Sequence, residues 1–265
     1  MKFCFSTLGC VDNTLEESIL LAKRFSLEGL ELRGVDGEID NGKISCFKEE
    51  NATKTKNIFS ENKIAPIVLG TSCAFHTEEK CESSIIEGKN AIDIASRLGT
   101  AYIRVFGNNI TGDREKCFAT VVKGISELCD YAKNKKVGVL LEVHGDFNTV
   151  ENLMPIVRSL EKYENFGLIW DIAHTHKIYG DSWQTFYGEM KKYIRHMHIK
   201  DISDSQGCLV LPGKGDIPIL PIIKQLSNDG YSGYFSLEWE KKWHPELPDI
   251  TKALECFSKL IKELG

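Results

Sequence analysis

Short apolar segments alternate with longer amphipathic segments along the whole chain. The short segments are rich in β-branched, aromatic and leucine side chains, as is typical of buried strands. We expect eight strands, over residues 2–7, 29–33, 64–69, 101–106, 137–143, 167–171, 194–199 and 233–238. No low-complexity stretch or Pro/Ser-rich linker interrupts the series.

The segments between these strands follow the 3.6-residue period of helices that bury one face. In the last segment one face collects six apolar residues: Ala253, Leu254, Phe257, Leu260, Ile261 and Leu264. Residues 84–98 repeat the pattern, with Gly99 placed as a helix C-cap. Strict alternation of eight strands with about eight helices, roughly 33 residues per unit, predicts an α/β fold, the (β/α)8 TIM barrel.

A doubly wound open sheet is the structural alternative. That fold normally carries a Gly-rich phosphate-binding turn after its first strand. Here residues 7–12 read Thr-Leu-Gly-Cys-Val-Asp, without the G-x-G-x-x-G spacing. We therefore favour one barrel domain over residues 1–265, with its metal and substrate site at the C-terminal ends of the strands.

Composition limits the classes of function. The 33 Lys and Arg against 38 Asp and Glu give a net charge of −5, which disfavours non-specific binding to nucleic acid or to a membrane surface. Nine scattered cysteines without a C-x-x-C pair indicate reduced thiols. No apolar run approaches a membrane span, and we expect a cytoplasmic protein.

Ionisable residues occur at the end of four successive predicted strands: Glu142, Asp171, His198 and Glu238. Alternation along a strand places each carboxylate on the face opposite its outward-packing neighbours, as Glu142 is opposite Val139 and Leu141. In a parallel barrel these ends meet at the same mouth, where active sites lie. Each residue taken singly is more often a satisfied polar group, but the set of four favours a site.

Three carboxylates and one imidazole would repel one another or remain unpaired without a cation between them. Oxygen-rich coordination of this kind suits one divalent metal ion, Mn2+, Mg2+ or Co2+ first, with Zn2+ as a further option.

Several segments resemble the xylose-isomerase-like TIM barrels of the sugar isomerase/epimerase group. The matching segments are residues 141–145 (Leu-Glu-Val-His-Gly), 170–174 (Trp-Asp-Ile-Ala-His), 196–201 (His-Met-His-Ile-Lys-Asp), 212–217 and 230–238, with weaker likeness at 29–33 and 104–107. Each segment alone is weak, whereas their order and spacing together are specific.

The resemblance implies that Glu142, Asp171, His198 and Glu238 bind the metal and that Glu142 and Glu238 also act as acid and base. Removing a proton beside a carbonyl needs such a base and a cation that stabilises the enediolate oxygen. We expect His144, His174 and Lys200 to bind substrate. Arg33 and Arg104 end the second and fourth strands, where they could bind substrate or pair with carboxylates. His196 lies one layer deeper, and Asp201 has the opposite parity.

Two positions depart from the ketose 3-epimerases of this group. Those enzymes carry a glutamate six residues after the first metal glutamate and an arginine six residues after the metal histidine, where this chain has Asn148 and Asp204. The sequence therefore predicts an isomerase or epimerase of a sugar or related polyhydroxy ketone, with an inosose- or 3-dehydroshikimate-type dehydratase as the alternative.

Two further classes rank lower. Endonuclease-IV-type repair enzymes need several more histidines, yet residues 202–216 contain none. A non-catalytic sugar-binding barrel would tolerate loss of a glutamate, and both are present. We expect a small sugar or polyol ketone as substrate, and neither nucleic acid nor membrane as partner. Homo-oligomers are common in the group, although nothing in the sequence locates an interface.

Overall fold

Eight parallel strands form a closed barrel in a computed structural model, which describes residues 1–264. The strands are β1 (Lys2–Ser6), β2 (Gly29–Leu32), β3 (Ala65–Ala74), β4 (Tyr102–Phe106), β5 (Gly138–Glu142), β6 (Phe166–Asp171), β7 (Ile194–Ile199) and β10 (Tyr234–Leu237). They follow the order β1-β10-β7-β6-β5-β4-β3-β2, and β1 pairs with β2 to close the ring. The predicted TIM barrel is confirmed; residue 265, the end of the predicted domain, lies outside this description.

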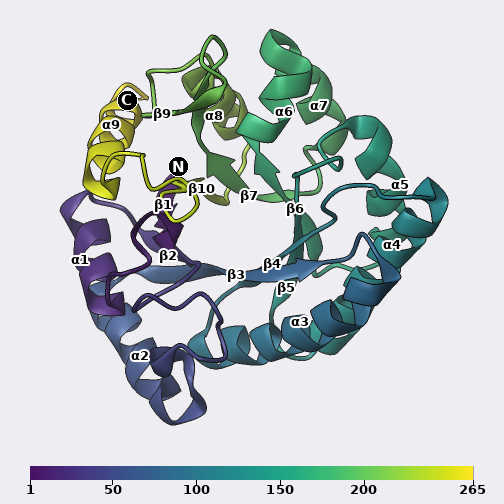
Figure 1. The fold of residues 1–265 in the computed structure, drawn as a ribbon. Helices are drawn as coiled ribbons and strands as arrows, with labels where there is room; N and C mark the ends of the chain where they lie inside the picture. The colour runs from purple at the N-terminus through teal and green to yellow at the C-terminus, as the bar shows by residue number, and fades with distance from the viewer. Residues whose placement is uncertain (265) are drawn as a thin grey trace.

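Helices surround the ring of strands (Figure 1). They are α1 (Leu15–Arg24), α2 (Glu49–Asn62), α3 (Glu78–Leu98), α4 (Arg114–Ala132), α5 (Val150–Leu160), α6 (Ile172–Tyr179), α7 (Trp183–Met190), α8 (Ile219–Asn228) and α9 (Ile250–Lys262), with short 3-10 helices η1 (Thr7–Cys10), η2 (Ser45–Phe47) and η3 (Gly180–Ser182). Within residues 1–264, none of these helices is long and apolar enough to cross a membrane.

The observed elements differ from the predicted ones mainly at their ends. Helix α3 begins six residues before the predicted 84–98, because the Thr77 side chain caps it at the backbone N–H of Lys80. Strand β3 continues to Ala74 through a register irregularity after Gly70. The antiparallel hairpin of β8 (Asp201–Ser203) and β9 (Cys208–Val210), which follows β7, has no counterpart among the predicted elements.

The apolar core has two parts that follow the alternation along each strand. Val139 and Leu141 belong to the large cluster between strands and helices, whereas Leu140 packs inside the barrel. The interior cluster is small and consists of Ile67, Val68, Leu140 and Ile169. It lies nearer the N-terminal ends of the strands, so the buried polar residues further along the strands pack above an apolar layer.

The packing of α4 against the end of β3 supplies a test of the fold. A Cβ placed on Gly124 of α4 would lie 2.2 Å from a ring carbon of the buried Phe75, a separation that side chains do not adopt. We expect Gly124→Val to destabilise the protein by about 1–3 kcal/mol, as overpacked cores do. The midpoint of urea unfolding, followed by circular dichroism, measures the change.

Gly188 in α7 is the matched control, because a Cβ there meets nothing within 4 Å. Gly188→Ala should stabilise the protein by roughly 0.5–1 kcal/mol through its higher helix propensity. Equal midpoints for the two variants would contradict the packing described for Gly124.

Candidate metal centre

Four buried side chains meet where β5, β6, β7 and β10 end. These strands are consecutive and parallel around the barrel, so their last residues lie at the same end of it. Asp171 pairs directly with His198 across β6 and β7, and Glu238 follows β10 with its N–H donating to the carbonyl of Ile199. One ligand atom from each of Glu142, Asp171, His198 and Glu238 lies within 4.8 Å of the others.

The two carboxylate oxygens of Asp171 have different contacts. Its Oδ1 caps helix α6 by accepting from the backbone N–H groups of Ala173 at 2.8 Å and His174 at 3.3 Å. The other oxygen, Oδ2, faces the cluster and lies 3.9 Å from His198 Nδ1. The start of α6 therefore fixes the rotation of this carboxylate, leaving Oδ2 available to a cation.

The donor set fits a divalent metal ion. His198 Nδ1 is buried, makes no hydrogen bond, and lies 3.2 Å from Glu238 Oε2 and 3.7 Å from Glu142 Oε1. A lone imidazole nitrogen opposite three carboxylates matches the ligand preference of Mn2+, Co2+ or Zn2+. Burial of so many acceptors without a cation between them would be costly.

Two buried cations already neutralise part of this charge. Arg104 Nη1 donates to Glu142 Oε2 at 2.9 Å, and Lys200 Nζ lies 2.7 Å from Asp171 Oδ2 and 2.6 Å from Glu238 Oε2. Burial alone would raise the pKa of Glu142, but the Arg104 guanidinium lowers it below its ordinary value. Burial would also raise the pKa of Glu238, but the charges of His198 and Lys200 lower that pKa well below its ordinary value. Both glutamates are ionised at neutral pH.

A cavity of about 310 Å3 opens above the cluster. Glu142, Glu238, Arg33, Arg104 and Lys200 are among its lining residues, so the structure brings these predicted site residues together. An adjoining cavity of about 300 Å3 is also lined by Lys200. The combined space suits a ligand the size of a small sugar.

The two histidines expected to bind substrate also line this space. His144 borders both cavities, whereas His174 borders the second, and their ring centroids lie 4.1 Å apart. Burial lowers the pKa of His174 below its ordinary value, so its ring is neutral and can both donate and accept a hydrogen bond.

The two arginines differ in their partners. Arg104 forms the ion pair with Glu142 described above, whereas Arg33 donates to the carbonyl of Ile39 at 3.1 Å and to the hydroxyl of Ser72 at 2.9 Å. Within residues 1–264, Arg33 forms no ion pair, although it is only 6% exposed. Burial and the nearby Arg104 lower the pKa of Arg33 to about 10.

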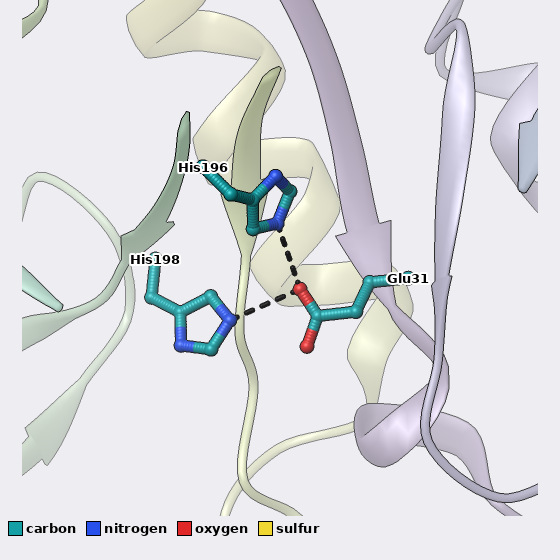
Figure 2. A group of neighbouring side chains, drawn as sticks. All are labelled: Glu31, His196 and His198. Carbon is teal, nitrogen blue, oxygen red and sulfur yellow. Dashed lines mark hydrogen bonds and ion pairs between the residues drawn. The ribbon is translucent and has the colours of Figure 1, made fainter. Parts of the chain in front are cut away.

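Sequence reasoning missed two acidic residues that contact the site. Glu240 accepts from Lys200 at the pocket rim. Glu31 of β2 is fully buried and accepts from the Nε2 atoms of His196 and His198 (Figure 2). Its alternation along β2 gave a signal, because Glu31 shares the inward face with Gly29 and Arg33.

Asp201 and the two positions that depart from the 3-epimerases have structural contacts. Asp201 accepts from the backbone N–H groups of Ile202, Gly213, Gly215 and Ile217, so it fixes the loop after β7. Asn148 donates to the carbonyl of His174, and Asp204 lies 3.2 Å from His176 Nε2.

Comparison with known families identifies the same fold. The family model described as xylose isomerase-like TIM barrel matches residues 19–260, and thus includes the strands that carry all four clustered residues. The chain belongs to this family.

Individual relatives share about a quarter of their residues with this chain. It is similar to a fructoselysine 3-epimerase of Shigella flexneri, with 24% identity over 66% of this chain and 66% of that protein, just under two thirds of its length. An inosose isomerase of Halalkalibacterium halodurans is 25% identical over 90% of this chain and 87% of its own. A crystal structure of an IOLI protein with a zinc atom superposes with a TM-score of 0.80 at 23% identity, covering 100% and 98% of the two chains.

Proposed function

We propose that the protein is a divalent-metal-dependent isomerase or epimerase of a sugar or related polyhydroxy ketone. The observation that supports it most strongly is the buried cluster of three carboxylates and one unpaired imidazole nitrogen at the floor of a polar cavity. The names of the two relatives, a 3-epimerase and an isomerase, support the same class of reaction.

Glu142, Asp171, His198 and Glu238 would hold the metal, for which Mn2+, Mg2+, Co2+ and Zn2+ are the candidates. A bound divalent ion would polarise the substrate carbonyl and stabilise the oxygen that becomes negative when a neighbouring proton leaves. The zinc atom in the related IOLI structure supports a divalent ion without deciding which one this chain prefers.

We assign the transfer of the proton to the two glutamates. They come from β5 and β10, the outer two of the four consecutive strands, so they flank the centre. One ionised carboxylate takes the proton from carbon. If the other glutamate has taken a proton from water, it returns that proton to the opposite face and inverts the carbon. If the proton instead goes to the former carbonyl carbon, while the neighbouring hydroxyl proton passes to the former carbonyl oxygen, the ketone is isomerised. Arg104 and Lys200 keep both carboxylates oriented.

Side chains around the cavity would bind the rest of the substrate. We assign the hydroxyl groups to His144 and His174. The His174 ring is neutral and can both donate and accept a hydrogen bond. Arg104 and Lys200 would reach oxygens next to the reacting carbon. The nine free cysteines support a reducing location such as the cytoplasm.

The metal assignment predicts about one divalent ion per chain in protein purified without chelator. Replacing His198 with alanine removes the nitrogen ligand, and Glu238→Gln removes a charge, so we expect both variants to lose most of the metal. Elemental analysis measures it, with Glu61→Gln on the exposed face of α2 as control. Full metal content in both site variants would refute the assignment.

The chemical step predicts deuterium uptake beside the carbonyl when the metal-loaded enzyme meets a panel of ketoses and inososes in D2O. We expect Glu142→Gln and Glu238→Gln each to slow exchange by roughly 10²–10⁴-fold, the usual contribution of a general acid or base. NMR follows the exchange, and the metal content of each variant is measured alongside it.

Glu61→Gln, the exposed change in α2, should exchange at the wild-type rate. The same spectra separate the dehydratase alternative, because dehydration begins with the same proton but yields an unsaturated ketone and water. Absence of exchange with every ketone, together with incision of abasic DNA, would contradict the proposal.

The buried charge of Arg33, unpaired within residues 1–264, leads us to predict that the substrate carries a carboxylate or phosphate. A buried guanidinium without an ionic partner in the cavity wall is costly unless a ligand supplies the anion. Arg33→Met should therefore raise KM for an acidic substrate by about 100-fold, the effect of losing one buried charge pair worth about 3 kcal/mol. KM for a neutral ketone should change little in the same variant.

Arg33→Lys keeps the charge and should recover part of the loss. Steady-state kinetics on matched acidic and neutral ketones, such as 3-dehydroshikimate and an inosose, measure both effects. An equal rise in KM for the two substrates would show that Arg33 only ties Ile39 to Ser72.

A further inference from the structure

A second group of ionisable side chains lies directly beneath the four-residue cluster. Glu31 Oε2 accepts a hydrogen bond from His196 Nε2 at 2.9 Å and another from His198 Nε2 at 3.0 Å (Figure 2). All three side chains are fully buried. Since β2 and β7 are separated by β1 and β10 in the barrel order, these bonds cross the barrel interior.

The acceptor oxygen of Glu31 determines which nitrogen of His198 carries a proton. An ionised carboxylate offers lone pairs only, so a ring nitrogen in contact with it must donate. In residues 1–264 neither lysine nor arginine pairs with Glu31, and its two imidazole contacts are the interactions that satisfy Oε2. In a neutral His198 ring the proton is then on Nε2, and Nδ1 keeps a free lone pair.

That lone pair points to the cluster above. His198 Nδ1 lies within 3.9 Å of carboxylate oxygens of Glu142, Asp171 and Glu238, and makes no hydrogen bond. The opposite tautomer would leave Nε2 and Glu31 Oε2 as two acceptors 3.0 Å apart in a buried site, which is strongly unfavourable.

We propose that Glu31 is the positioning residue of the metal centre, which fixes the His198 ring in the orientation that presents Nδ1 to the metal. The proposal rests on the metal-binding role assigned to His198 above. His196 has a supporting part, because its own hydrogen bond holds the shared oxygen of Glu31 in place. Carboxylates behind a ligating histidine commonly change metal affinity by about 10–100-fold.

The first measurement uses metal-free protein with 15N-labelled histidine. Long-range 1H–15N correlation spectra distinguish a protonated from an unprotonated ring nitrogen, and His198→Asn identifies the signals. We expect a fully protonated Nε2 in the wild type and partial loss of that proton in Glu31→Gln. A wild-type ring protonated only on Nδ1 would overturn the proposal, even if every Glu31 variant failed to fold.

The second measurement is metal affinity, by titration against a competing chelator with Zn2+ or Mn2+. Glu31→Gln should weaken binding about 10–100-fold while its circular dichroism spectrum stays unchanged. Ser236→Ala is the matched control, because Ser236 pairs with His198 in the barrel register and its buried hydroxyl makes no hydrogen bond. Equal affinities for Glu31→Gln, Ser236→Ala and wild type would refute the role of Glu31.

The two experiments separate this inference from the proposed function. A wild-type protein that binds no metal contradicts the metal centre, whereas the proton on His198 Nε2 can be measured in metal-free protein whether or not the protein binds metal. A fully protonated Nε2 that persists in Glu31→Gln would contradict the positioning role while leaving the metal centre unaffected.

Discussion

Three carboxylates, Glu142, Asp171 and Glu238, are almost completely withdrawn from water at one end of the barrel. Each would lose several kcal/mol of hydration if nothing positive replaced the water. Arg104 and Lys200 supply two such charges through direct contacts. The need for positive charge also explains the unpaired Nδ1 of His198. This nitrogen lies among the three carboxylates, where it and they would together bind a further cation. The other polar contacts of the site neutralise these carboxylates, and the site depends on that neutralisation.

The barrel makes this concentration of charge structurally possible. Parallel pairing brings the ends of β5, β6, β7 and β10 to the same mouth of the barrel, so four residues far apart in sequence converge there. Beneath them the interior changes from polar to apolar, through Glu31 and His196 to the cluster around Leu140. The catalytic end is therefore supported from below, while the loops above it are free to shape the cavity.

Much of this arrangement can be predicted from the sequence. Alternation of apolar and amphipathic segments is sufficient to predict the barrel, and the position of Glu142, Asp171, His198 and Glu238 at strand ends is sufficient to predict that they meet. Partners across the barrel are not predictable in the same way. The contact of Glu31 with His198 depends on which strands face each other across the interior, and local periodicity carries no such information. The strands β8 and β9 have three residues each, too few to give a periodic signal.

The two oxygens of Asp171 link a helix to the chemistry of the site. One oxygen caps the start of α6 and the other faces His198, so the carboxylate cannot turn toward a ligand without releasing the helix. His174 sits in the first turn of that helix and reaches the cavity. Any displacement of α6 would therefore move a cavity-lining imidazole and a clustered carboxylate together. The Asp171 side chain, which caps α6, therefore sets the distance between the four-residue cluster and the cavity-lining ring of His174.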